Sequence, residues 1–197
     1  MAIAERNYTF CWEDLGDIKT GRPNLGQEVP VLAYRLLQYT IRDVLATEFD
    51  GPMAAALFVK AGRRAGEEFC RHVLDTTLDF TRFIAQLQQT LRDLKIGILR
   101  IEKADLKTLE MTLTIAEDLD CSGLPPSGET VCQYDEGFIA GILHTYTGKE
   151  FRVKEVDCWA TGDRVCRFAV NVREPNPEWT TGTNQSCMTS RTGSPIS

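Results

Sequence analysis

The chain has 197 residues and a formal net charge of -6, which is enough length for one domain with a sizeable core. It has no block rich in Lys and Arg, so its charge gives no support for binding nucleic acid or an anionic membrane. No apolar stretch approaches the roughly 20 residues of a membrane-spanning helix, and the N-terminus lacks the pattern of a secretion signal. We therefore expect a cytoplasmic protein without a membrane span.

The composition along the chain predicts one domain with two irregular ends. Glycines and a proline interrupt any periodicity in residues 1–28, which indicates an N-terminal arm. Residues 29–173 carry the periodic apolar patterns of a folded domain. Residues 174–197 are rich in Pro, Thr, Ser, Gly and Asn, which predicts a disordered tail.

Apolar residues at helical spacing predict four helices in the domain. They run from about Pro30 to Leu45, from Met53 to Leu74, from Phe80 to Leu94 and from Thr130 to Thr147. The first is expected to bury the face formed by Val31, Tyr34, Leu37, Ile41, Val44 and Leu45. In the second, Gly62 and Gly66 would allow another backbone to approach closely.

Alternation with a period of two predicts the strands. These begin at Ile96, span Met111 to Ile115, and form a final hairpin of Phe151 to Cys158 and Arg164 to Val172. The segment from Glu117 to Glu129 holds three acidic residues beside Cys121 but lacks the Asp and Gly pattern of a calcium loop. We expect it to be a solvated loop.

The seven cysteines are many for a cytoplasmic chain of this size, and an odd number argues against complete disulfide pairing. Clustered cysteines in a reducing compartment are typical of metal ligands or catalytic groups. Cys132, Cys158 and Cys166 fall in one stretch. The scattered cysteines are expected to act as small buried apolar residues; they are Cys11, Cys70, Cys121 and Cys187.

The final hairpin favours a metal site. A short turn centred on Gly162 would place Cys158 and Cys166 opposite each other, with Cβ atoms about 5 Å apart. Glu155 has the opposite parity to Cys158, but the apolar phase changes along this strand, which predicts a β-bulge near Lys154 and Glu155 that turns side chains to one face.

Three thiols and a carboxylate would complete a tetrahedral zinc site of the structural kind, with Cys132, Glu155, Cys158 and Cys166 as ligands. The alternative is a disulfide between Cys158 and Cys166, which cross-strand geometry also permits. The absence of a secretion signal favours the metal.

Aromatic and apolar side chains on the predicted helices and strands could line a ligand pocket. The candidates are Tyr34, Phe58, Phe69, Phe83 and Met111. The same pattern is typical of an ordinary core, so both interpretations stay open.

Two segments, GFIAGILHTYTGKEF and VKEVDCWATGDRVCRF, together with the upstream Cys132, resemble the 4-vinyl reductase domain family. The resemblance covers about residues 30–172 and carries the family's Cys, Glu-x-x-Cys and Cys pattern. It implies an α/β (α+β) fold similar to TRAPP vesicle-tethering subunits, with helices packed on an antiparallel sheet and a C-terminal zinc-binding hairpin. The family includes the sensor domains of phenol- and xylene-responsive activators and a protein of bacteriochlorophyll synthesis.

The resemblance implies a sensor or carrier module that contains structural zinc and binds an apolar small molecule. A tetrapyrrole, such as a bilin or chlorophyll precursor in a photosynthesis-related role, is the ligand we expect. The expected partner is a second copy or a related protein of the same family. The alternatives are an assembly protein that acts through a dimer surface and a vinyl reductase. The sequence lacks a dinucleotide-binding fingerprint and a flavin-like motif, which favours a non-enzymatic role.

Overall fold

The computed structural model describes residues 9–173. Residues 9–27 belong to one unit, whose described part contains two single-turn helices, η1 (Trp12–Leu15) and α1 (Ile18–Gly21). The expectation of an entirely irregular arm is therefore wrong, because Asp17 caps α1 by accepting a hydrogen bond from the backbone N–H of Thr20. The predicted tail at 174–197 and residues 1–8 lie outside the described residues.

Residues 28–173 form the second compact unit, which contains the remaining helices and all the strands of the described chain. Its four strands form one antiparallel sheet in the order β1-β2-β4-β3. Their bounds are β1 Ile98–Asp105, β2 Glu110–Ala116, β3 Phe151–Asp157 and β4 Cys166–Val172. The predicted three-residue turn of the last hairpin is wrong, because residues 158–165 connect its strands and include the short helix η2 (Trp159–Thr161).

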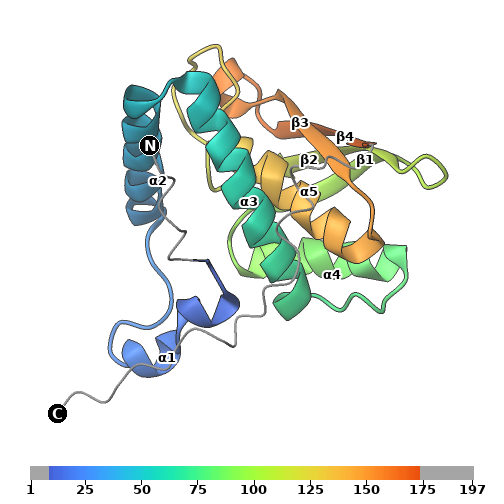
Figure 1. Cartoon of the computed structure of the whole chain (residues 1–197), viewed down its shortest axis with the longest axis horizontal. Helices are drawn as coiled ribbons and strands as arrows, with labels where there is room; N and C mark the ends of the chain where they lie inside the picture. Colours follow the sequence, from blue (N-terminus) through green and yellow to red (C-terminus); the bar gives the residue numbers. More distant parts are fainter. Residues whose placement is uncertain (1–8, 174–197) are drawn as a thin grey trace, which may run out of the picture. The chain divides into compact units, whose positions relative to one another are not determined.

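Four helices of this unit are layered on the sheet. They are α2 (Val31–Glu48), α3 (Gly51–Val73), α4 (Phe80–Asp93) and α5 (Gln133–Thr147). Figure 1 shows α4 and α5 against the sheet, α3 beside α5, and α2 beside α3. This arrangement confirms the predicted fold class of helices packed on an antiparallel sheet.

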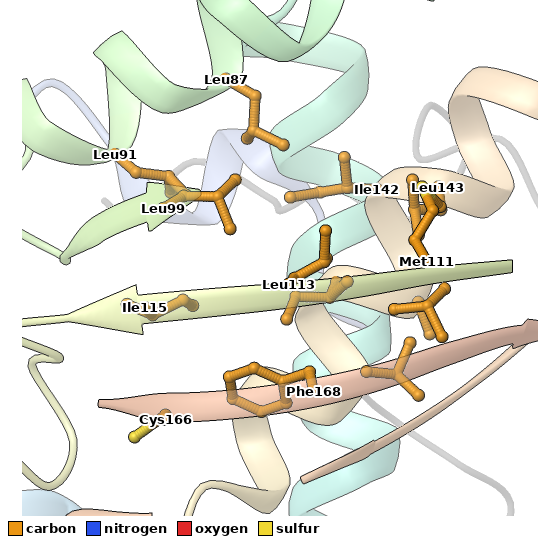
Figure 2. Packing of buried hydrophobic residues seen from close by; sticks show 14 of the residues in the cluster. Leu87, Leu91, Leu99, Met111, Leu113, Ile115, Ile142, Leu143, Cys166 and Phe168 are labelled. Atoms are coloured by element: carbon orange, nitrogen blue, oxygen red, sulfur yellow. The ribbon is translucent and has the colours of Figure 1, made fainter. Parts of the chain in front are cut away.

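Buried side chains of the sheet face α4 and α5. Leu113 of β2 and Phe168 of β4 lie opposite each other in the register and are almost completely buried. Figure 2 shows them among Leu87 and Leu91 of α4 and Ile142 and Leu143 of α5. Burial of these apolar side chains is the main favourable contribution to folding.

Helices α3 and α5 touch backbone to backbone through glycines on both sides. A Cβ atom at Gly62 would lie 2.0 Å from the carbonyl oxygen of Tyr134, and one at Gly66 would lie 2.1 Å from that of Phe138. In return, Gly137 and Gly141 of α5 press against carbonyl groups of α3. The predicted close approach at Gly62 and Gly66 is confirmed. The contact fixes how near α5, and the residues at its start, lie to α3.

Helix α2 is turned the opposite way to the prediction. Its exposed residues include Val31, Leu32, Leu36, Leu37, Ile41 and Val44, whereas its more buried positions are mostly polar. Gln38 is the one residue of α2 that is fully buried, and Tyr34 and Arg35 are half-buried. The periodicity identified the helix correctly, but hydrogen-bonding partners elsewhere in the fold hold its polar face inward.

The glycine contact leads to a first prediction. Gly141→Ala would place a methyl group 2.2 Å from the carbonyl oxygen of Arg63, so α3 and α5 must separate. We expect the free energy of unfolding to fall by about 2 kcal/mol or more, as measured by urea denaturation. The matched control is Gly51→Ala in the first turn of α3, where a Cβ atom meets no neighbour within 4 Å. Equal stability of the two variants would contradict the contact.

Candidate metal centre and apolar cavity

Four cysteines meet at the start of α5. The sulfur atoms of Cys121, Cys132, Cys158 and Cys166 all lie within 4.8 Å of one another, and the four residues are at most 1% exposed. Cys132 precedes α5, Cys158 follows β3 and Cys166 begins β4. Cys121 lies in the connection between β2 and α5. Three separate parts of the chain therefore supply thiols to one point.

The spacing of the sulfur atoms fits a tetrahedral metal ion. Zn²⁺ holds thiolates at about 2.3 Å, which puts the sulfur atoms of a tetrahedron about 3.8 Å apart. The Sγ atom of Cys132 lies 3.8 Å from that of Cys158 and 3.7 Å from that of Cys166. The Sγ atoms of Cys121 and Cys166 are 3.0 Å apart, which is closer than a tetrahedral edge and longer than a disulfide. The donor set fits a thiophilic metal.

Glu155, the predicted carboxylate ligand, lies close to the cluster but is not one of these four groups. The backbone N–H of Cys132 donates to its Oε2 atom over 3.0 Å, and its buried Oε1 atom has no hydrogen-bond partner among the described residues. The predicted β-bulge is present one residue later, at Val156, because Glu155 pairs with Phe168 and Asp157 with Arg167. The bulge lets Glu155 and Cys158 both point inward.

The sequence-based expectation for the segment around Cys121 is wrong. Cys121, Asp118 and Asp120 are buried, not solvated. The Oδ1 atom of Asp118 accepts hydrogen bonds from the backbone N–H groups of Asp120 and Cys121, which folds the segment into a tight turn. A cysteine flanked by acidic residues was the available signal, but its position far from the other cysteines in sequence hid it.

Buried carboxyl groups surround the thiols. Burial, followed by the neighbouring Asp120, raises the pKa of Asp118 to about 7. Burial likewise raises the pKa of Glu155 to about 8 and that of Asp135 well above its ordinary value. These groups are pushed toward their neutral forms, so the site has an excess of negative charge that a cation would relieve.

The thiols differ in how easily they ionise. Hydrogen bonding from Cys121, and then from Cys132, lowers the pKa of Cys158. Hydrogen bonding within the same cluster raises the pKa of Cys132. Cys158 is therefore the thiol that the cluster stabilises as a thiolate, which is the form that binds a metal.

An apolar cavity of about 20 Å³ lies between α4, α5 and the sheet. Its walls are aliphatic and aromatic side chains, including Leu87, Leu113 and Phe138, several of which appear in Figure 2. Asp135 is the one charged residue that lines it. The Oδ2 atom of Asp135 is buried without a hydrogen-bond partner among the described residues, and a carboxylate oxygen of this residue lies within 4.8 Å of the sulfur of Cys132.

One of the five predicted pocket residues, Met111, lines this cavity. The other four lie elsewhere. The hydroxyl of Tyr34 donates to Asp120, and the Phe58 ring lies under the guanidinium group of Arg42. Phe69 packs on Phe138, and Phe83 stacks on Tyr146 with ring centroids 3.8 Å apart. Aromatic character alone did not separate cavity from core.

Residues 111–172 match the 4-vinyl reductase domain family. Two uncharacterized proteins of Methanocaldococcus jannaschii are each 28% identical to the chain, over 109 and 149 residues. These matches cover 55% and 75% of the chain, and 62% and 81% of the relatives. The chain thus spans less than two thirds of the first of these relatives.

Three solved structures share the fold. A vinyl-4-reductase family protein of M. jannaschii has a TM-score of 0.55 at 16% identity and covers 88% of this chain and 99% of its own. The phenol-responsive sensory domain of the transcription activator PoxR, solved with phenol, has a TM-score of 0.56 at 14% identity over 79% and 81% of the two chains.

A trafficking protein particle complex subunit 3 from Naegleria fowleri, covalently bound to palmitic acid, has a TM-score of 0.55 at 12% identity over 74% and 98%. None of the described helices is long and apolar enough to cross a membrane. The predicted resemblance is confirmed: residues 111–172 match the 4-vinyl reductase domain, and the chain shares its fold with a vinyl-4-reductase family protein, a phenol sensor domain and a TRAPP subunit.

Proposed function

We propose that the protein is a metal-stabilised module that binds a small apolar molecule in the cavity between α4, α5 and the sheet. The observation that carries this proposal is a cavity with apolar walls and a single carboxyl group, that of Asp135. Binding sites for small molecules commonly combine apolar walls with a few polar groups that orient the ligand. The PoxR domain, whose fold the chain shares, was solved with phenol, which supports the same general use.

The side chain of Asp135 gives the cavity a preference. A buried carboxyl oxygen without a partner is costly, and a ligand that donates a hydrogen bond to it would remove that cost. The ligand class that fits is therefore an apolar body with one hydrogen-bond donor. The donor would point toward the start of α5, and the apolar body toward Leu87 and Leu113.

The size of the cavity bears on the identity of the ligand. About 20 Å³ holds little more than one water molecule, so a ligand must displace side chains as it enters. Met111 is the flexible side chain best suited to move. A small ligand needs less displacement than a tetrapyrrole. The tetrapyrrole and its photosynthesis-related role stay predictions, and the visible absorbance of protein purified from its source would test them.

A second prediction tests the cavity. Leu87→Phe adds volume inside it, whereas Leu94→Phe adds the same volume at a residue that is 53% exposed at the end of the same helix. We expect benzyl alcohol to raise the melting temperature of the wild type and of Leu94→Phe, because a ligand at 100 times its Kd stabilises by about 2.7 kcal/mol. Leu87→Phe should lose most of this rise. An equal rise in both variants would place the ligand elsewhere.

We further propose that the metal is zinc and has a structural role. Cys132, Cys158 and Cys166 are the thiolates common to the predicted ligand set and to the cluster of four cysteines. The tetrahedral spacing of their sulfur atoms supports this assignment, as does the chemistry of thiolates. Bound zinc would offset the excess negative charge and hold the hairpin against α5.

A third prediction concerns metal removal. The protein should contain about one zinc ion per chain, and Cys158→Ser should lose it together with thermal stability, whereas Cys70→Ser, a buried free cysteine outside the cluster, should keep both. Elemental analysis and thermal denaturation measure the two quantities. Complete chelation without loss of stability would refute the structural role.

The loss on chelation should be larger at pH 8 than at pH 5. The raised pKa values of Asp118 and Glu155, about 7 and about 8, mean that the metal-free folded state holds protons that the unfolded chain has released above about pH 4. Stability of the metal-free state is therefore complete below that pH and is lost as the pH rises through the folded values. Zinc binding strengthens over the same range because thiols ionise.

The exposed face of α2 favours a dimer of this chain as the working form. Val31, Leu32, Leu36, Leu37, Ile41 and Val44 form this face, which we call the α2 apolar face; each is at least 45% exposed. Monomeric proteins rarely expose a continuous apolar patch of more than a few hundred Å², and a standard interface buries about 800 Å² per partner. Two antiparallel copies of α2 would cover each other, and an assembly role through this face is the second candidate function.

A fourth prediction tests this face. Leu36→Glu places a charge in its middle and should convert the dimer to a monomer, as measured by sedimentation equilibrium. The control is Ala46→Glu, at an exposed residue of α2 outside the α2 apolar face, which should stay dimeric. A wild type that is monomeric at all accessible concentrations would contradict the proposal.

A further inference from the structure

The connection between β2 and α5 touches both the cysteine cluster and α2. Cys121 contributes its sulfur to the cluster, and its neighbour Asp120 points to α2. The Oδ1 atom of Asp120 accepts a hydrogen bond of 2.7 Å from the hydroxyl of Tyr34, and its Oδ2 atom accepts one of 2.6 Å from the side-chain amide of Gln38. Adjacent residues therefore serve two different elements.

Further hydrogen bonds join α2 to the same short segment. The Tyr39 hydroxyl donates to the carbonyl oxygen of Asp120 over 3.1 Å. The guanidinium group of Arg35 donates to the carbonyl oxygens of Leu119 and Ser122, over 2.8 and 2.9 Å. The polar face of α2 thus finds its partners in residues 119–122. This explains why α2 turns its polar face inward and its apolar face outward.

We propose that Cys121 is the fourth thiolate ligand of the metal, in place of Glu155, and that its bond to the metal fixes residues 118–122 and through them the position of α2. This inference rests on the metal centre proposed above. Cys121 is fully buried and lies 3.0 Å from Cys166, so little movement brings its sulfur to a tetrahedral corner.

The contacts of Glu155 support an outer role. Its Oε2 atom already accepts the backbone N–H of Cys132, which holds that cysteine and the start of α5 in place. A carboxylate so engaged stabilises the neighbouring ligand without binding the metal itself, as residues around metal sites commonly do. The ligand set is then four thiolates from three segments, and the metal links the hairpin, α5 and the support of α2.

The assignment has a consequence for the partner surface. Without the bond between Cys121 and the metal, residues 118–122 keep their own hydrogen bonds but lose one anchor in the core. The amides of α2 should then exchange with solvent faster, because the helix rests on this segment through its polar face. Metal occupancy is thereby coupled to the α2 apolar face.

Sulfur counting on the wild-type protein is the direct test and needs no variant. X-ray absorption spectroscopy of the zinc-loaded full chain should show four sulfur ligands at about 2.3 Å. Three sulfur ligands and one oxygen ligand would overturn the proposal in favour of Glu155. Absence of bound zinc in the wild type would overturn both this inference and the proposed metal centre, whereas ligand binding in the cavity is tested independently by benzyl alcohol.

Matched variants supply the second test, with Co²⁺ as the probe. Cys121→Ser should weaken the thiolate-to-metal absorption by about one quarter, as one of four equivalent thiolates is lost. Glu155→Gln should leave it unchanged and lower metal affinity by no more than about 10–100-fold. The control Cys70→Ser should match the wild type. The opposite pattern, with Glu155→Gln altered and Cys121→Ser unaltered, would overturn the assignment.

Hydrogen exchange tests the link to α2. In the wild type, removal of zinc should speed amide exchange in both α5 and α2. In Cys121→Ser loaded with zinc, α5 should stay protected while α2 exchanges at the metal-free rate. Protection of α2 that follows zinc equally in wild type and Cys121→Ser would overturn the coupling.

Discussion

The meeting of four buried thiols at the start of α5 is the interaction on which the proposed arrangement depends. The thiols come from the connection after β2, the start of α5 and the β3–β4 hairpin, and carboxyl groups of high pKa surround them. Like charges and burial both oppose ionisation there, so without a cation the site must stay protonated. A bound metal converts this unfavourable concentration of acidic groups into bonds that join three parts of the chain.

The orientation of α2 follows from the same region. An amphipathic helix ordinarily buries its apolar face, because burial of apolar surface is the dominant favourable contribution to folding. Here Asp120 is buried and accepts hydrogen bonds from Tyr34 and Gln38, and leaving it unpaired would cost more than exposing several leucines that a partner can cover. The polar requirements of the segment beside the metal centre therefore set the direction of the α2 apolar face.

The helices and strands were largely predictable from local patterns, since periods of 3.6 and 2 survive whatever packs against them. The glycines of α3, the bulge after Glu155 and three of the clustered cysteines also left local signals. The role of Cys121 did not, because it comes from a turn closed by Asp118 and from partners far away in sequence. The inward polar face of α2 was hidden for the same reason, since periodicity identifies a helix but not its partner.

The cavity and the metal centre share the first turn of α5, and this limits how independent they can be. Cys132 lies directly before the helix, and Asp135, three residues later, lines the cavity while its carboxylate lies within 4.8 Å of the Cys132 sulfur. The backbone contact with α3 leaves α5 no room to shift sideways, because carbonyl oxygens already fill the space beside its glycines. A ligand that bonds to Asp135 must therefore act through the electrostatics and hydrogen bonding of this turn, because movement of the helix is blocked. That route leads to the thiols, then to residues 118–122, and then to α2.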